Sequence, residues 1–218
     1  MPSEKLMNRL IRNLEVPVVI LLFLAGSTFL LKMCYLSLLQ NTVIGGSLLL
    51  ALYGYLYGRH RLKIPVVSLL LVLAAVEVDA FGNHFRMYGQ QFGPIMYDEF
   101  AHMTVQALTA PIIIWLAGSV IVMSGYHLPL GLITFFSITM LFSITGFYEI
   151  IELWDELYFS GQRIGTPHDA PNDLQWDLAG IIIGSASTYV VMKTYGAMKF
   201  AVGAGPGEAG ALARSVRG

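Results

Sequence analysis

Apolar runs long enough to cross a lipid bilayer recur along this chain, and no other feature restricts its fold so strongly. A helix of about 20 apolar residues spans the hydrocarbon core of a membrane. Hydrophobic residues make up 56% of the 218 residues and charged residues only 12%, a balance that no soluble domain of this size needs to fill its core. We therefore expect an all-α integral membrane protein, a bundle of about six transmembrane helices, at 16–36, 43–57, 65–78, 97–123, 128–159 and 174–195.

Basic residues predict the orientation, because short cytoplasmic segments carry more Lys and Arg than external ones. Most of them precede the first span, join the second to the third, or follow the sixth: Lys5, Arg9, Arg12, Arg59, Arg61, Lys63, Lys193, Lys199, Arg214 and Arg217. Both termini are thus expected in the cytoplasm. The expected organisation is a cytoplasmic segment at 1–15, a transmembrane domain at 16–196, and a flexible Gly/Ala-rich cytoplasmic tail at 197–218.

A secretory signal peptide is the alternative interpretation of the first thirty residues, since a basic start precedes an apolar stretch with the small residues Ala25 and Gly26. The apolar run continues through Leu31, which favours a membrane span.

Several function classes lack their sequence signatures. Cys34 is the single cysteine, which excludes an internal disulfide. The chain has no Walker loop and no GxSxG elbow, so phosphate-loop and serine-hydrolase chemistry have no support. The formal net charge is −1, and we expect no nucleic-acid partner.

Acidic and imidazole side chains form three pairs with helical spacing: Asp98 with His102, Glu149 with Glu152, and Asp173 with Asp177. Residues three or four apart share a helix face. The fourth and sixth predicted spans begin on the outer side, where the fifth ends. The three pairs are therefore expected in one layer at the outer membrane interface.

Five carboxylates in one layer repel each other strongly if they also share the bundle interior. Each unscreened pair at about 6 Å costs about 3 kcal/mol at an effective dielectric constant of about 20. Two divalent ions would neutralise four of the five negative charges, and paired carboxylates and His hold two-metal centres in helical bundles. We therefore expect one or two divalent ions. The oxygen-rich donor set suits magnesium, manganese, iron or zinc, but it does not choose between hydrolytic and oxidative chemistry. No catalytic residue is assigned.

Simpler explanations exist for single residues. Asp98 and Asp173 lie at predicted helix starts, where the helix dipole favours a carboxylate without any function. His102 alone fits an interfacial histidine bonded to a backbone carbonyl. Glu149 and Glu152 approach a helix C-terminus, where negative charge is disfavoured, so the dipole does not explain them.

Further polar residues are expected around these pairs. We predict a second shell from four side chains near the outer ends of spans three and five: Asp79, His84, Asp155 and Glu156. Gly82 can turn the chain and bring His84 inward. His168 and Asp169 are expected in a loop. Solvated loop residues are the default interpretation, and a lid over the site is the sharper hypothesis.

Small and aromatic residues suggest how the helices pack. Gly180 with Gly184, and Gly54 with Gly58, have the spacing that lets membrane helices approach closely, and we favour packing within the chain over dimerisation. Several aromatic residues fit an outer interfacial belt or the lining of a lipid pocket: Tyr97, Tyr148, Trp154, Tyr158 and Trp176.

The ordered motifs resemble a known family. Tyr97-Asp98-x-x-x-His102, Tyr148-Glu149-Ile150-x-Glu152-x-x-Asp155, and Asp173-x-x-x-Asp177-Leu178 with Gly180 and Gly184 resemble the small bacterial inner-membrane proteins labelled YjdF-like, whose function is unknown. The resemblance runs from the second to the sixth predicted span. It implies a membrane fold in the bacterial plasma membrane and the same motif set, and it supplies no reaction.

Two classes of function follow. The first is a metal-dependent membrane enzyme, a hydrolase or an oxidoreductase, acting on a lipid or lipid-linked substrate. The second is non-enzymatic: an accessory subunit of a membrane complex, or a cation- or proton-coupled transporter. Transport predicts acids near the bilayer midplane that continue to the inner face, whereas the acids here stop at one interface.

Overall fold

The computed structural model describes residues 51, 54–55, 64–159 and 168–195, and for residues 66, 80, 83, 84, 155, 159 and 195 the backbone only. The predicted first span, most of the second, the segment 1–15 and the tail 197–218 lie outside the described residues. The described elements are α3 (Val66–His84), β1 (Gln91–Phe92), β2 (Ile95–Met96), α4 (Tyr97–Met123), α5 (Leu130–Phe159) and α6 (Asp169–Tyr195).

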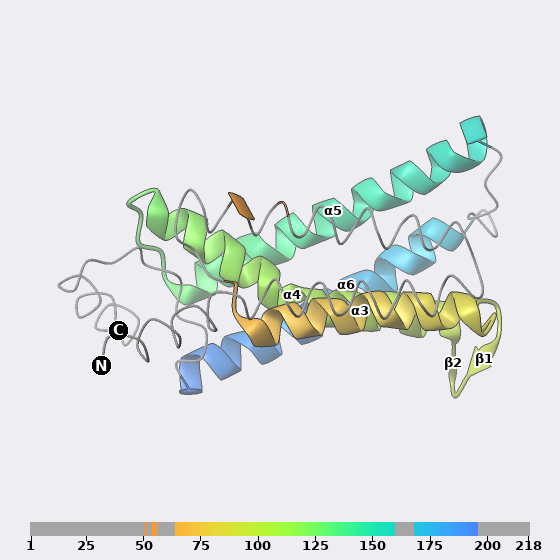
Figure 1. Cartoon of the computed structure of the whole chain (residues 1–218), viewed down its shortest axis with the longest axis horizontal. Coiled ribbons are helices and arrows are strands. Elements are labelled where there is room, and N and C mark those ends of the chain that lie inside the picture. Colours follow the sequence, from red (N-terminus) through yellow and green to blue (C-terminus); the bar gives the residue numbers. More distant parts are fainter. Residues whose placement is uncertain (1–50, 52–53, 56–63, 160–167, 196–218) are drawn as a thin grey trace, which may run out of the picture.

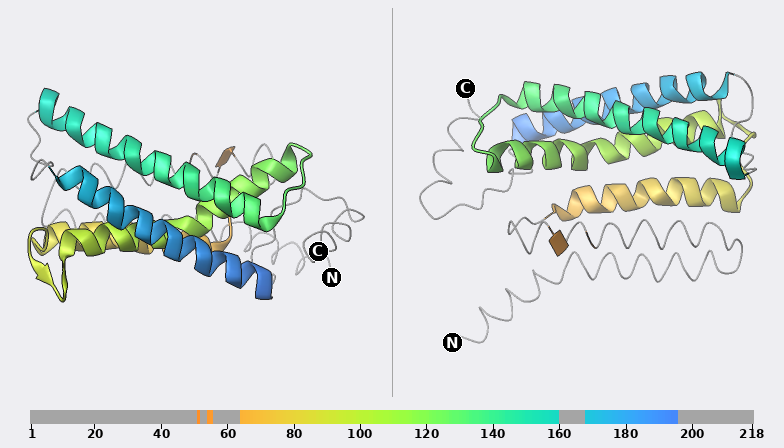
Figure 2. Two further views of the ribbon diagram at one scale, coloured as in Figure 1. Left: turned by 180° about the vertical axis from the view of Figure 1, so that it is seen from behind. Right: turned by 90° about the horizontal axis from the view of Figure 1, so that it is seen from above.

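Helix α4 is the centre of the described bundle. It packs most extensively against α6 and then against α3, while α5 packs against both α6 and α4. Figure 2 shows α4 between α3 on one side and the pair α5 and α6 on the other. The C-terminal end of α5 rises away from the start of α6 (Figure 1).

Among the described residues, two helices have the length and apolarity of membrane spans: Tyr97–Met123 with 27 residues, and Leu130–Tyr158 with 29 residues. At about 1.5 Å per residue, each exceeds the hydrocarbon thickness of about 30 Å. The end of α4 coincides with its predicted bound, and α5 begins two residues later than predicted.

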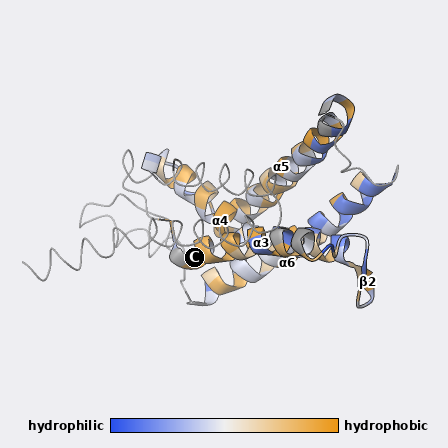
Figure 3. Cartoon of the chain, turned by 45° about the vertical axis from the view of Figure 1, so that its right-hand side comes forward, coloured by the Kyte–Doolittle hydropathy of each residue, from blue (hydrophilic) through white to orange (hydrophobic). Residues whose placement is uncertain are grey.

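The apolar interior consists of small clusters between α4, α5 and α6. One contains Ile114, Ile133 and Met192, and the other contains Ala110, Leu141 and Ile181. Polar residues gather elsewhere: hydrophilic colours mark the part of α6 that begins at Asp169 (Figure 3). The bundle therefore has an apolar middle and a polar end.

Two glycines let α4 and α6 approach backbone to backbone. A Cβ at Gly180 would collide with the carbonyl group of Met103, and one at Gly184 with that of Ala107. Glycines four apart permit this contact because they present no side chain to the neighbouring helix. The prediction that Gly180 and Gly184 serve packing within the chain is confirmed. The corresponding prediction for Gly54 and Gly58 stays a prediction, since Gly58 lies outside the described residues.

Pro111 lies inside α4, four residues after Ala107. Because proline has no N–H, the Ala107 carbonyl lacks its usual donor within the helix. Gly184 lies against this same carbonyl, and Cα–H···O contacts recur where helices pack closely. Gly184 of α6 thus contacts α4 at the Ala107 carbonyl, which Pro111 leaves without a backbone donor.

A short antiparallel hairpin joins α3 to α4. Gln91 pairs with Met96, and Phe92 with Ile95. Gly93 in the turn has a φ of 66°, which glycine adopts without steric cost. These strands correct the expectation of helices alone. A strand of two residues is too short to produce an alternating pattern in the sequence.

Tyr97 is buried rather than placed in an aromatic belt. It is 3% exposed, and its hydroxyl donates to the Val78 carbonyl at 2.6 Å. A Cβ at Gly82 would collide with the Tyr97 ring, so Gly82 provides space for this ring. Helix α3 continues through Gly82 to His84, and the expectation that Gly82 turns the chain is wrong.

Candidate metal centre

The start of α4 sets the positions of Asp98 and His102. The backbone N–H of Met96 donates to the Glu99 carboxylate at 3.0 Å, which caps the helix at its first turn. Asp98 and His102 follow one helical turn apart and therefore share a face. The His102 Nε2 atom lies 3.7 Å from Asp98 Oδ1.

Helix α6 begins earlier than the apolar pattern predicted. It starts at Asp169, so the expectation of a loop lid containing Asp169 is wrong for this residue. The first turns of α6 contain several polar residues and therefore do not continue the apolar run: Asp169, Asn172, Asp173, Gln175 and Asp177. Asp173 and Asp177 therefore lie in the second and third turns of the helix rather than at its start, where a simple dipole or capping role has less force.

Two contacts bring the starts of α4 and α6 together. The Asn172 side chain donates to Glu99 Oε1 at 3.3 Å, and Gly180 lies against Met103. Asp177 precedes Gly180 by one turn and His102 precedes Met103 directly, so the glycine contact brings these two side chains opposite each other.

His102 is the centre of the cluster. Its Nδ1 atom lies 3.0 Å from Asp177 Oδ1, and its Nε2 atom lies 3.8 Å from Asp173 Oδ2. One ligand atom from each of Asp98, His102 and Asp173 lies within 4.8 Å of the others. These three residues could therefore share one metal ion.

Helix α5 contributes Glu149. Apart from Thr134, the described buried residues of α5 form a stripe with a spacing of four: Ile133, Ser137, Leu141, Thr145 and Glu149. Glu149 is the polar end of this stripe and is 9% exposed. Ligand atoms of Glu149, His102 and Asp177 also lie within 4.8 Å of one another.

Three carboxylate oxygens in this cluster are buried and have no hydrogen-bond partner: Glu149 Oε1, Asp173 Oδ1 and Asp177 Oδ2. Within the described part of the chain, His102 is the only basic side chain within 4.0 Å of Asp98, Asp173 or Asp177. Removing an ionised carboxylate from water costs on the order of several kcal/mol unless a counter-charge compensates it. The donor set therefore fits a divalent cation.

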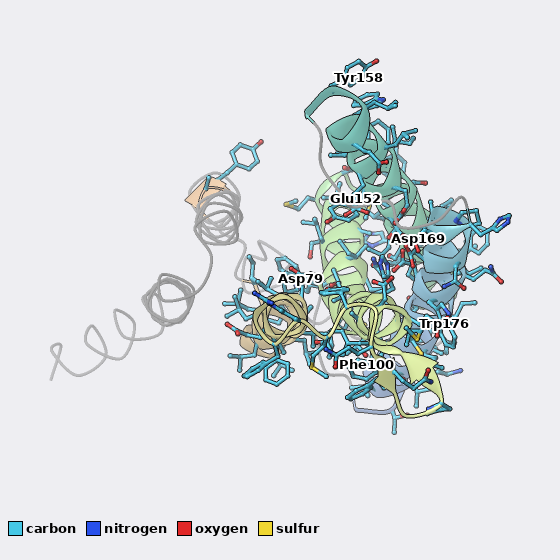
Figure 4. All side chains as sticks on the ribbon, turned by 90° about the vertical axis from the view of Figure 1, so that its right-hand side faces the viewer. Asp79, Phe100, Glu152, Tyr158, Asp169 and Trp176 are labelled. Atoms are coloured by element: carbon cyan, nitrogen blue, oxygen red, sulfur yellow. The ribbon has the colours of Figure 1, made fainter. Side chains whose placement is uncertain are left out.

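The remaining predicted residues whose side chains the structure describes lie outside the two groups. Glu152 is half-buried and Glu156 is exposed on α5, beyond Glu149. The side chains of His84 and Asp155 are outside the described part of the structure. Figure 4 shows Asp79 on α3 and Tyr158 at the far end of α5, away from Asp169 at the start of α6.

Asp79 belongs to a contact of its own. It accepts a hydrogen bond from the Tyr88 hydroxyl at 2.6 Å. Burial, followed by the charge of Asp79 and this hydrogen bond, raises the pKa of the Tyr88 phenol above its ordinary value. Asp79 thus helps to fasten the hairpin to α3, and it takes no part in either ligand group.

A family model described as predicted membrane protein (DUF2238) matches residues 16–197. The chain belongs to this family. The match includes every helix named above and all five residues of the two candidate ligand groups, and it confirms the resemblance to YjdF-like membrane proteins. Searches of curated proteins and of solved structures found no match. The DUF2238 chain is therefore a helical membrane protein, and the lipid bilayer is its environment.

Some residues that position the candidate ligands of this DUF2238 protein were not predicted from the sequence. Glu99 and Asn172 join the starts of α4 and α6. A signal for Glu99 was available, since an acid three residues after a helix boundary caps the first turn. Asn172 is a single polar residue in the first turn of α6, and Tyr88 is a single aromatic residue in the connection between α3 and β1. No local pattern distinguishes either of them.

Proposed function

We propose that this DUF2238 protein is a six-span membrane protein with a divalent metal centre at its outer interface, acting as a metal-dependent enzyme on a lipid or lipid-linked substrate. The observation that carries the proposal is the set of three buried, unpartnered carboxylate oxygens around His102. One or two ions of manganese, iron, magnesium or zinc match these donors. The segments 1–15 and 197–218 flank the bundle on the cytoplasmic side.

The centre has the composition expected of a reactive rather than a closed site. Each group offers three side chains, and three protein ligands leave coordination positions for water or substrate. A metal in such a site polarises a phosphoryl or carbonyl oxygen, or activates a water molecule. The ligands supply charge and geometry, while the ion determines whether the chemistry is hydrolytic or oxidative.

Apolar surroundings support a lipid-like substrate. The residues that follow Glu149 on α5 are exposed and mostly apolar: Ile150, Ile151, Leu153, Trp154, Leu157 and Tyr158. In a bilayer these side chains meet acyl chains at the level of the carboxylates. A substrate with an apolar tail and a polar head would match both surfaces.

Elemental analysis tests the metal centre. Protein purified in detergent without chelators should contain about one or two equivalents of a divalent metal, and Asp173→Asn with His102→Ala should remove it. Asp169→Asn is the matched control, because Asp169 lies on the same helix and outside both ligand groups. Equal metal content in all variants would contradict the centre and favour an accessory role in a membrane complex.

Lipid turnover tests the enzymatic part separately. Metal-loaded wild-type protein in vesicles of phosphatidylethanolamine and phosphatidylglycerol should change the lipid profile, measured by mass spectrometry, and the metal-free double variant should not. Metal binding with identical lipid profiles would contradict this substrate assignment while leaving the metal centre in place.

Cysteine labelling tests the orientation. In a Cys34→Ser background, His168→Cys should react with an impermeant maleimide in intact cells, and Tyr126→Cys only after the membrane is disrupted. Both positions are exposed and precede opposite ends of the bundle, at the starts of α6 and α5. The reverse pattern would place the site on the cytoplasmic face.

A further inference from the structure

The two ring nitrogens of His102 face different carboxylates. Nδ1 lies beside Asp177, and Nε2 lies near Asp98 and Asp173. A neutral imidazole has one N–H donor and one nitrogen lone pair, and only the lone pair can bind a metal. The two sides of the ring must therefore have different roles in the proposed metal centre, on which this inference rests.

The Nδ1 side has hydrogen-bond geometry. The distance of 3.0 Å from Nδ1 to Asp177 Oδ1 is the usual length of an N–H···O bond. Asp177 is 1% exposed, so water does not compete for this oxygen. An ionised carboxylate can only accept, which puts the imidazole proton on Nδ1.

The Nε2 side has a different spacing. Its distances of 3.7 Å to Asp98 and 3.8 Å to Asp173 are too long for hydrogen bonds. Around a metal with bonds of about 2.1 Å, two ligands lie about 3.4 Å apart in a tetrahedron and at most about 4.2 Å apart. The separations of Nε2 from these carboxylates fall within this range.

Exposure distinguishes the two sides as well. The Asp98 side chain is 29% exposed, that of Asp173 is 7% exposed, and that of Asp177 is 1% exposed. An ion from solution therefore reaches the Nε2 side through Asp98. The Nδ1 side is the closed end of the cluster.

We propose that Asp98, Asp173 and Nε2 of His102 bind the divalent ion, and that Asp177 is a positioning residue that fixes the His102 ring through its Nδ1–H. Carboxylates of this kind orient metal-binding imidazoles, and their removal typically lowers metal affinity about 10- to 100-fold. Of the two ligand groups, the one that contains Asp98 and Asp173 is thus the primary position of the ion.

Nuclear magnetic resonance of ¹⁵N-histidine-labelled protein, loaded with Zn²⁺ in detergent, tests this directly. His102 should show a zinc-bound Nε2 and a protonated Nδ1, with its signals assigned by their loss in His102→Ala. The control histidine is His127, which is exposed on the connection between α4 and α5 and should keep its signals when Zn²⁺ is added.

Two substitutions at one position separate orientation from general stability. Asp177→Asn keeps an oxygen acceptor for Nδ1–H, so it should retain Nε2 coordination and lose less than about tenfold in Zn²⁺ affinity. Asp177→Leu removes the acceptor and keeps the branched shape of the side chain, and it should lower Zn²⁺ affinity about 10- to 100-fold. The protonated Nδ1 signal of His102 should be present in Asp177→Asn and absent in Asp177→Leu. A purely structural role for Asp177 would not produce this difference.

The outcomes distinguish the two proposals. Zinc on Nδ1, or unchanged affinity in a folded Asp177→Leu variant, would overturn the positioning role while leaving the metal centre intact. Absence of Zn²⁺ and Mn²⁺ binding by the wild-type protein would overturn both. If Asp177→Leu does not fold, the wild-type spectrum and Asp177→Asn still decide the question.

Discussion

The pair α4 and α6 and the helix α5 contribute to the same cluster in different ways. Between α4 and α6 the backbones touch at Gly180 and Gly184, and this pair carries four of the five residues in the two ligand groups. Helix α5 contributes Glu149 alone and exposes long apolar runs on both sides of it. Ligand geometry is best kept by rigidly packed elements, so α4 and α6 form the scaffold of the site and α5 completes it.

Breaking the contact between α4 and α6 should have the largest effect. Gly180→Leu would force a side chain against the Met103 carbonyl, and overpacking of this kind costs about 3 kcal/mol or more. Thermal unfolding in detergent, followed by circular dichroism, measures the loss. Gly146→Leu on α5 is the control, because a Cβ there meets no atom within 4 Å; an equal loss in both variants would contradict the comparison.

Removing the central ligand should leave the fold in place and abolish the site. His102→Ala is expected to lower Mn²⁺ affinity by more than about 100-fold, beyond the loss typical of a supporting residue. Equilibrium dialysis measures the affinity. His168→Ala, at the exposed residue before α6, should bind Mn²⁺ like the wild type, and a matching loss there would mean that the effect is not specific to the cluster.

The contribution of α5 should be smaller. Glu149→Gln keeps the shape of the side chain and removes its charge, and we expect about a tenfold loss in Mn²⁺ affinity, the lower end of the range for supporting carboxylates. Glu156→Gln, exposed two turns further along α5, is the control. A loss for Glu149→Gln as large as that for His102→Ala would make α5 an equal part of the scaffold.

Substitutions on the exposed face of α5 should have the smallest effect on stability. Leu157 is 64% exposed, so Leu157→Ala is expected to change the free energy of unfolding in detergent by less than about 0.5 kcal/mol. Ile181, which is fully buried between the helices, provides the contrast, since Ile→Ala in a core costs about 2–5 kcal/mol. Similar effects at both positions would indicate that a partner covers α5.

The sequence predicted those features that depend on long runs or helical spacing. Both bounds of α4 agree with the structure, and the glycine spacing of α6 identified a real backbone contact. The structure also brings residues of all three motifs together. Successive membrane helices run in opposite directions, so the starts of α4 and α6 lie at the same side as the end of α5. These predictions needed only the periodicity of a helix and the thickness of a bilayer.

The remaining features depend on tertiary contacts. Glu149 and Glu152 are equivalent by spacing, yet Glu149 lies in a ligand group and Glu152 does not, because the rotation of α5 against its neighbours is fixed by packing. Gly82 was predicted to turn the chain, whereas a glycine is needed there because a Cβ would collide with the Tyr97 ring. The start of α6 was missed because the helix continues into polar sequence beyond its apolar run.

The proline in α4 has a mechanical consequence. Pro111 lies between the turn that carries Asp98 and His102 and the C-terminal end of the helix at Met123. Helices bend most readily where a backbone hydrogen bond is missing, so we expect α4 to bend at this residue. The half that ends at Met123 can then tilt as the bilayer thins or thickens, while the half that carries Asp98 and His102, held to α6 at Gly180, stays in place.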